Sequence, residues 1–399
     1  MLNRARVRYA RLISSAGLVL ALVATSCGGT STAGGGSGAK GPVNIGAIID
    51  ETGANASVGP DQLGGLNAYI NNINATGGVD GHQIKINVMD SQSMPTVAVQ
   101  DYHQLVSDSS NVVMIGPTFT AAGILVLPLT AQDQIPYLAP VVTDSFMGPW
   151  FFRTIPSNAI DALSLLQYAK SQGDTQIGLL YPNESQGISG AQDIMAAAPG
   201  LGMTIVASQS YPSNTLDPTV EIDKVRAANP QAYIVNDGSN LDRLTLTIRT
   251  MRSIGITQII GTELPASSPA FVTGVQGRGS GVNGVYFWAF SAPGQNTNSD
   301  EAAFQTIYEK TSSGHAAADS FALIGAMWGE MIVGAIKELD KQGKPITRAN
   351  MKTAFGELTG LVTVLGTLQY TPTQHDKPFN STVIIVYNAQ GQQILGAHG

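Results

Sequence analysis

The sequence has little charge and almost no cysteine. Only 12% of its 399 residues are charged, and Cys27 is the sole cysteine. A charge-rich disordered chain or a coiled coil would need far more charge, and one cysteine cannot form a disulfide within the chain. The length exceeds that of a usual single domain, so we expect two domains of roughly 150 to 200 residues.

Positive charge is scarce after the first 26 residues. Without them, 17 basic and 28 acidic residues remain, a net charge of −11. Such a surface repels phosphate backbones and anionic headgroups. We therefore expect no nucleic-acid partner, and contact with a membrane only through an anchor.

The usual catalytic and metal-binding motifs are missing. The five histidines form no His-Glu-x-x-His pattern, no Gly-x-Ser-x-Gly elbow occurs, and no second cysteine could complete a zinc site. The run Gly277–Gly281 has the glycines of a dinucleotide loop but follows an expected helix, so a surface turn fits better. These absences predict no metal, no cofactor and no enzyme.

The first 27 residues have the order of an export signal. Four arginines precede an apolar run from Leu12 to Ala24, which is too short for the roughly 20 residues that span a bilayer. Ala24-Thr25-Ser26-Cys27 resembles a bacterial lipobox, although Cys27 could also be an incidental cysteine. We expect a signal peptide over 1–26 and a lipid-anchored, glycine-rich tether over 27–41. No later apolar stretch is expected to span a membrane.

From Val43 onward, short apolar runs alternate with stretches of helical period. Leu63, Leu66, Ile70 and Ile73 recur at helical spacing, and further helices are expected near 96–108, 121–134, 159–172, 187–198, 218–228, 240–254 and 319–341. The expected strands are 43–50, 84–90, 112–116, 135–138, 177–181, 204–208, 232–237, 259–263, 285–289 and 382–388. This alternation predicts an α/β fold with doubly wound parallel sheets, which bind ligands at the carboxyl ends of their strands.

Two of these strand ends carry hydroxyl groups. Thr118, Phe119 and Thr120 lie between an expected strand and helix, and Thr143 and Ser145 follow the next strand. Hydroxyls and backbone N–H groups at helix N-termini can bind a carboxylate without arginine. Thr120 and Thr143 could equally be helix caps.

Several segments, in a fixed order, resemble the leucine/isoleucine/valine-binding protein family. They are Gly59–Gly81 (GPDQLGGLNAYINNINATGGVDG), Gln83-Ile-Lys-Ile, Asp90, Ile115–Ala121 (IGPTFTA), Ile135–Asp144 (IPYLAPVVTD), Arg153-Thr154 and Gly261-Thr-Glu263. The resemblance implies a type I periplasmic-binding fold of two lobes joined by three crossovers, with hinges near 155, 289 and 373. It places 42–155 and 289–372 in one lobe and 156–288 and 373–399 in the other.

The resemblance also implies a function and a site. It implies a monomeric, extracytoplasmic receptor that captures an amino acid or similar small carboxylate and delivers it to an ABC permease. Thr120 and the loop formed by Val141, Val142 and Thr143 would hold the ligand's carboxylate, next to Thr118 and Phe119 in the strand–helix loop described above. Glu263 would accept its ammonium group, although a solvated loop glutamate is the alternative. A surface sensor of the same fold and a secreted α/β hydrolase are the rival functions.

Three positions depart from the family's aromatic side-chain pocket. Val58, Gln186 and Ser239 stand where aromatic residues are common. We therefore expect a roomier, wetter pocket that favours a larger or more polar ligand than leucine. Asp237 could accept a hydrogen bond from a further donor group on the ligand, or it could cap a turn.

Overall fold

The computed structural model describes residues 40–143, 148–278, 280–290, 299–312, 317–376, 378–379 and 382–398. The expected signal peptide, Cys27, nearly all of the tether and Ser145 lie outside the described residues. Residues 39–399 form one compact unit, and their two principal sheets are described in turn.

The first sheet is entirely parallel and has the strand order β2-β1-β3-β4-β5. Its strands are β1 (Val43–Ile49), β2 (Ile84–Asp90), β3 (Asn111–Ile115), β4 (Tyr137–Ala139) and β5 (Phe151–Arg153). The order reverses between β1 and β3, and ligands bind at such a switch point in open α/β sheets. The loops that follow β1 and β3 are therefore the first place to look for a site.

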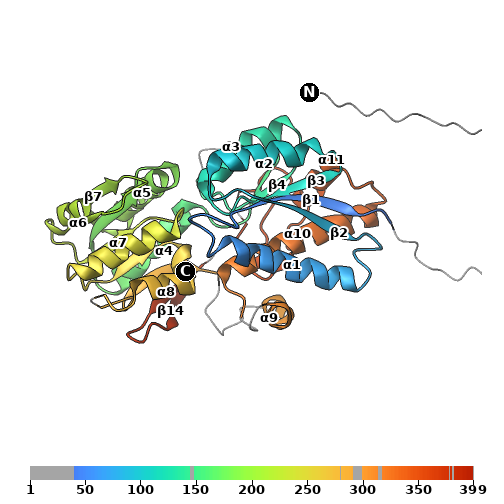
Figure 1. The fold of residues 1–399 in the computed structure, drawn as a ribbon. Coiled ribbons are helices and arrows are strands. Elements are labelled where there is room, and N and C mark those ends of the chain that lie inside the picture. Colours follow the sequence, from blue (N-terminus) through green and yellow to red (C-terminus); the bar gives the residue numbers. More distant parts are fainter. Residues whose placement is uncertain are drawn as a thin grey trace, which may run out of the picture. The chain divides into compact units, whose positions relative to one another are not determined.

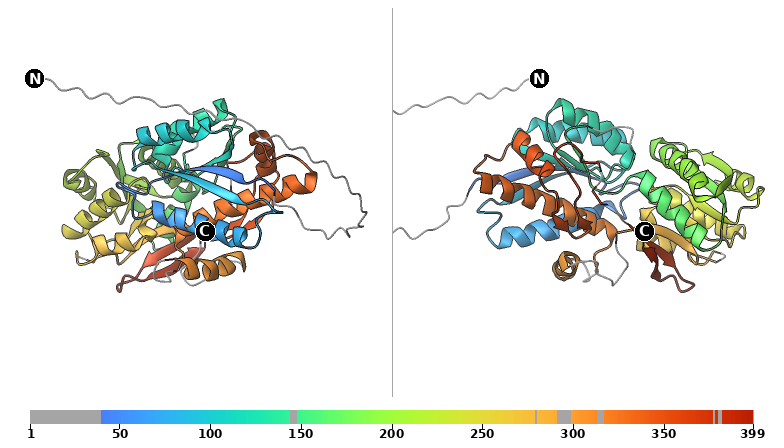
Figure 2. Two further views of the ribbon diagram at one scale, coloured as in Figure 1. Left: turned by 45° about the vertical axis from the view of Figure 1, so that its right-hand side comes forward. Right: turned by 180° about the vertical axis from the view of Figure 1, so that it is seen from behind.

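Helices cover both faces of this sheet, and together they form the first lobe. Helices α1 (Gly59–Ala75) and α10 (Ser320–Gln342) lie side by side on one face, and α2 (Pro95–Ser107) and α3 (Thr120–Gln132) lie on the other (Figures 1 and 2). Helix α9 (Ser299–Thr311) packs on α1, and α11 (Arg348–Gly356) packs on α10 and β3. A short hairpin of β11 (Val362–Thr363) and β12 (Gly366–Thr367) follows α11.

The second sheet is mixed, with the order β14-β13-β10-β9-β8-β6-β7. Strands β6 (Gln176–Pro182), β7 (Thr204–Tyr211), β8 (Ala232–Val235), β9 (Ile260–Thr262) and β10 (Val285–Ala289) are parallel. Strands β13 (Val383–Tyr387) and β14 (Gln393–His398) add an antiparallel hairpin at the β10 edge. This hairpin extends the expected parallel sheet at one edge, and a short turn at Asn388 joins its two strands.

Five α-helices surround the second sheet and complete the second lobe. They are α4 (Asn158–Ser171), α5 (Ser185–Ala197), α6 (Thr219–Arg226), α7 (Leu241–Ser253) and α8 (Pro269–Val275). Short 3-10 turns occur at η1 (Ala198–Leu201) and η2 (Leu264–Ser267). The chain passes between the lobes after β5, after β10 and before β13, which gives the expected three crossovers. The exact lobe boundaries stay a prediction.

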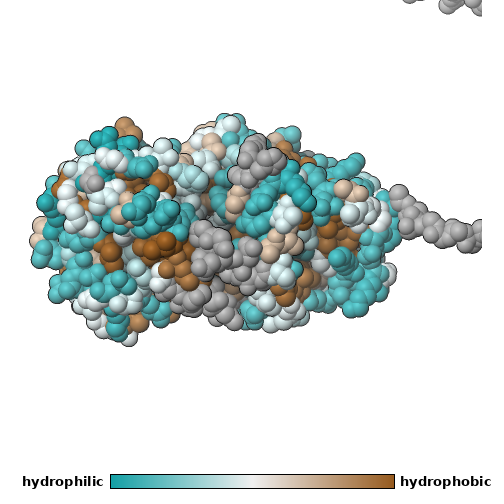
Figure 3. Space-filling model, turned by 90° about the horizontal axis from the view of Figure 1, so that it is seen from below, coloured by the Kyte–Doolittle hydropathy of each residue, from teal (hydrophilic) through white to brown (hydrophobic). Residues whose placement is uncertain are grey.

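By length and composition, α10 could cross a membrane, which the sequence analysis did not anticipate. It is the one such helix among the described residues, and 78% of its most apolar window is buried inside the protein. Helices α1 and α11 pack against it, so α10 serves as a core helix. The face in Figure 3 is mostly hydrophilic, with hydrophobic residues in patches separated by polar ones.

Candidate ligand-binding site

The loop between β3 and α3 forms one wall of a cavity. Gly116 has φ 81°, and a Cβ atom there would lie 1.9 Å from the carbonyl oxygen of Ile48, so only glycine fits this turn. The turn brings Thr118, Phe119 and Thr120 to the cavity, as expected. The first N–H groups of α3 have no partner within the helix, and a carboxylate can accept from them.

The two threonine hydroxyls in this loop also hold backbone segments together. Thr118 Oγ1 accepts from the Asp50 N–H at 2.9 Å. Thr120 Oγ1 accepts from the Val142 N–H at 3.1 Å and donates to the Pro140 carbonyl at 3.3 Å. Neither side chain caps α3, whose N-cap residue is Phe119. The Thr118 proton therefore stays available to a ligand.

The loop after β4 contributes less than expected. Val142 lines the cavity, but Val141 is fully buried in the core around Tyr137 and Phe151. The Thr143 carbonyl accepts from Arg153 Nη2 at 3.0 Å, and its hydroxyl is buried with no hydrogen-bond partner among the described residues. Thr143 caps no described helix and does not line the cavity, so its assignment to the carboxylate site stays a prediction.

Glu263 lies at the opposite wall, directly after β9. The side chain is buried, and its Oε2 atom accepts from the Trp288 indole N–H at 2.9 Å. Burial raises the pKa of Glu263 to about 7, with a smaller contribution from the negative charge of Asp237, while the Trp288 hydrogen bond opposes the shift. No described residue forms an ion pair with Glu263, so this buried carboxylate at the cavity suits a positively charged ligand group.

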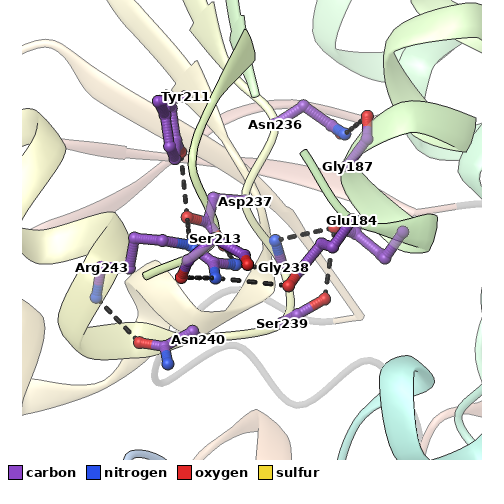
Figure 4. Close-up of polar contacts among 11 residues, drawn as sticks. Glu184, Gly187, Tyr211, Ser213, Asn236, Asp237, Gly238, Ser239, Asn240 and Arg243 are labelled. Carbon is purple, nitrogen blue, oxygen red and sulfur yellow. Dashed lines mark hydrogen bonds and ion pairs between the residues drawn. The ribbon is translucent and has the colours of Figure 1, made fainter. Parts of the chain in front are cut away.

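Gln186, at the start of α5, also lines the cavity. Its Oε1 atom accepts from the Gly238 N–H at 3.3 Å and lies 3.4 Å from the Ser239 hydroxyl. Figure 4 labels Gly238 and Ser239, which make these contacts. Gly238 reaches the cavity, but Ser239 is held behind it and is not part of the lining.

A buried ionic network stabilises the loops behind Gln186 and Gly238 (Figure 4). Arg243, on α7, binds both carboxylate oxygens of Asp237 at 2.7 Å and Glu184 Oε1 at 2.7 Å. Asp237 Oδ2 also accepts from the Tyr211 hydroxyl at 2.9 Å. Since its carboxylate is bound within the protein, Asp237 positions this wall and does not line the cavity.

The assembled cavity is small and mainly apolar. It holds about 390 Å³ of empty space including its open side, and its lining residues are Gln62, Thr118, Phe119, Thr120, Pro140, Val142, Ile155, Gln186, Gly238, Glu263, Leu264, Pro265, Trp288, Phe321 and Ile324. The expectation of a roomier, wetter pocket stays a prediction, since of the three replaced positions only Gln186 lines the cavity. Val58 is buried in the core at the start of α1, and Ser239 lies behind the wall, so these two replacements do not open the cavity.

Sequence reasoning missed the wall formed by helix and strand interiors. Gln62 comes from α1, Phe321 and Ile324 come from α10, and Trp288 comes from β10. One signal was present for Gln62, because it stands four residues before Leu66 on the apolar stripe of its helix. The other three are ordinary core residues by type.

The described part of the chain contains neither a candidate metal site nor a candidate dinucleotide-binding loop. It contains no group of three His, Cys, Asp or Glu residues that could hold a metal ion. The segment around Gly277 and Gly281 follows α8 and leads through turns into β10. It is thus a surface turn and lacks the strand-turn-helix arrangement of a dinucleotide site.

The chain matches one protein family over most of its length and several proteins over half of it. The family model described as periplasmic binding protein matches residues 42–392. Leu/Ile/Val-binding protein homolog 8 of Brucella suis is 27% identical over 224 residues, which is 53% of each chain. The chemotactic signal transduction system substrate-binding protein BasB of Halobacterium salinarum is 24% identical over 217 residues, covering 50% of this chain and 51% of BasB. The chain therefore spans about half the length of these relatives.

Solved structures share the whole fold. The branched-chain amino acid transporter substrate binding protein LivJ of Streptococcus pneumoniae, in complex with isoleucine, superposes with a TM-score of 0.78 at 17% identity, covering 88% of this chain and 97% of LivJ. A solute binding protein of an ABC transporter from Rhodopseudomonas palustris, in complex with benzoate, gives 0.77 at 14% identity, covering 90% and 97%. At these identities the likeness establishes the two-lobed fold.

Proposed function

Because the chain belongs to the periplasmic binding protein family, we propose that it is an extracytoplasmic receptor that binds an amino acid or similar small carboxylate and delivers it to an ABC permease. One observation carries the proposal. The start of α3 and the buried carboxylate of Glu263 line the same small cavity. These are complementary partners for the two charged ends of a zwitterion.

The cavity is suited to binding without chemistry. Its described lining residues include no serine, cysteine, lysine or histidine. The hydroxyls of Thr118 and Thr120 bind backbone groups and Glu263 binds Trp288, so no hydroxyl is paired with a base. The carboxylate would accept from the first N–H groups of α3 and from Thr118, and Glu263 would pair with the ammonium group. Closing of the lobes would exclude water and strengthen both interactions.

A sensory role is the second candidate. It is favoured by the similarity to BasB, which is described as part of a chemotactic signal transduction system. The same cavity would then report the ligand to a signalling partner. Deleting the gene separates the two roles, because a transport receptor is needed for uptake of the labelled ligand and a sensor for the response to it.

The proposed function predicts a thermal shift. At 100 times the dissociation constant, a ligand adds about 2.7 kcal/mol to the free energy of unfolding, which is a rise of roughly 4 °C for two lobes of this size that unfold as one unit. Residues 42–399 should show this rise with at least one free amino acid, and no rise with its amide or its deaminated analogue. If neither any amino acid nor benzoate changes the melting temperature, the proposal is wrong.

We also propose that Cys27 carries a lipid that anchors the protein to the cell membrane. The four arginines, the apolar run and the lipobox-like Ala24–Cys27 support this proposal. Cys27→Ser should move the protein from the membrane fraction to soluble or unprocessed forms, as followed by fractionation and metabolic labelling with palmitate. Mature Cys27→Ser protein that still sediments with membranes would contradict the anchor.

A further inference from the structure

Gln62 is a polar residue on the most buried stripe of α1. Val58, Leu66 and Ile70 lie on the same stripe at intervals of four residues, and all are buried. Gln62 itself has no exposed surface. An apolar residue is expected at this position of a helix packed on a sheet.

The packing of α1 on α10 fixes where Gln62 lies. A Cβ atom on Gly65 would lie 1.9 Å from the Ala322 carbonyl oxygen, and one on Gly325 would lie 1.9 Å from the Gln62 carbonyl oxygen. The two backbones are therefore in direct contact. Gln62 shares this wall of the cavity with Phe321 and Ile324, which come from α10.

The amide group of Gln62 lacks a partner. Neither Oε1 nor Nε2 has a hydrogen bond to any residue that the structure describes, and both atoms are buried. Leaving a buried polar group unpaired costs about 1 to 3 kcal/mol. A leucine of similar size would remove this cost, so the amide is retained at the expense of stability.

The other polar side chains of the lining already have partners. The Thr118 and Thr120 hydroxyls bind backbone groups, and Glu263 binds Trp288. Gln186 binds Gly238. Gln62 is thus the lining side chain, within the described residues, whose donors and acceptor are all unused.

We propose that Gln62 determines specificity by hydrogen-bonding an uncharged polar group on the ligand's side chain. The site would then select a small amino acid with a hydroxyl or carboxamide over its apolar isostere. The inference rests on the proposed function, in which Glu263 is already committed to the ammonium group. A charged ligand side chain would need a second counter-ion, and no other charged residue lies in the described lining.

The unpaired amide of Gln62 predicts which ligands the site rejects. A site built to hydrogen-bond a hydroxyl or amide rejects the analogue that lacks it, because the buried polar group is then left unpaired. Threonine should therefore bind more tightly than valine, or asparagine more tightly than leucine.

These two isosteric pairs are the probes for calorimetric titration of the purified mature protein. In at least one pair, the wild type should prefer the polar member by about tenfold or more, equivalent to about 1.4 kcal/mol. Gln62→Leu should lose or reverse that preference. Gln104→Leu is the matched control, because Gln104 is an exposed residue on α2 away from the cavity, and it should keep the wild-type ratio.

Melting of the ligand-free proteins gives a second readout. Gln62→Leu and Gln62→Met should melt at a higher temperature than the wild type, because each removes an unpaired buried amide. A lower melting temperature in both would mean that the amide has a structural partner, which overturns the inference. An unchanged selectivity ratio in Gln62→Leu would also overturn it while leaving the receptor function intact. If the wild type binds none of the four probes, the inference is overturned, while the thermal-shift series with all amino acids still decides the proposed function.

Discussion

Glu263→Gln should weaken the binding of a zwitterionic amino acid by roughly 30- to 4,000-fold. The substitution keeps the shape and one acceptor oxygen but removes the negative charge that faces the cavity. Leaving the ligand's ammonium group desolvated and unpaired costs about 2 to 5 kcal/mol, and every 1.4 kcal/mol is tenfold in affinity. Calorimetric titration with the amino acid found by thermal shift measures this loss.

The pH dependence of binding follows from the same carboxyl group. In the empty protein the pKa of Glu263 is raised to about 7 by burial, so below pH 7 a proton must leave before the ammonium group can pair. The affinity should therefore fall by about tenfold per pH unit below 7 and level off above it. The Glu263→Gln protein should lack this slope between pH 5 and 7.

The same shift affects the stability of the empty protein in the opposite direction. A carboxyl group with a raised folded-state pKa contributes stability that is fully present below its unfolded value of 4.5 and is lost as the pH rises to about 7. Glu263 should therefore contribute least to the stability of the ligand-free protein above pH 7, the range in which the ligand binds most tightly. Melting curves with and without ligand between pH 4.5 and 8 should diverge as the pH rises.

Glu330→Gln is the matched control for Glu263→Gln. Glu330 is also buried, burial raises its pKa to about 8, and its Oε2 atom accepts from the Val364 N–H at 2.9 Å. It does not line the cavity, so Glu330→Gln should keep the wild-type affinity. If Glu263→Gln also keeps it, the ligand has no ammonium group at this position, and an aromatic or aliphatic acid held by the α3 loop becomes the better assignment.

Most of the fold could be predicted because its strands are short, apolar and bounded by turn residues. The expected strand 84–90 matches β2, and the helix expected at 319–341 matches α10 to within one residue at each end. Strand β5 was missed because Phe151–Arg153 is only three residues long. Strand β14 (QILGAH) was missed because it is short and Gly396 interrupts its apolar residues. Its pairing with β13 depends on tertiary contacts.

The candidate site was predictable where it follows strand ends and not where it lies within elements. Thr120 and Glu263 could be found because parallel sheets place their ligands at the carboxyl ends of strands. Trp288 and Phe321 look like core residues, and only the packing of the sheet and of α10 brings them to the cavity. The position of Val58 within the core likewise depends on how α1 packs, which no local pattern specifies.

Arg243→Met should lower the free energy of unfolding by about 3 to 5 kcal/mol, because it leaves the carboxylate of Asp237 buried without its cation. Arg243 binds both Asp237 oxygens and Glu184, and the Arg243 and Asp237 side chains are 6% and 0% exposed. At about 1.3 °C per kcal/mol for a protein of this size, the melting temperature should fall by at least about 4 °C. Lys341→Met is the control, since it removes an exposed pair with Glu338 and should leave the melting temperature unchanged.

Two further measurements separate loss of the ion pair from loss of packing. Burial already raises the pKa of Asp237, and removing Arg243 should raise that pKa further. Protonation of Asp237 then removes the unpaired charge in Arg243→Met. The difference in free energy of unfolding between the variant and the wild type should therefore shrink as the pH falls toward 4. Adding Asp237→Asn should likewise recover part of the lost stability, because the unpaired charge is gone. If the deficit is independent of pH and the double variant is less stable than Arg243→Met, Arg243 stabilises this wall of the cavity through packing, and the charge of Asp237 is not the cause.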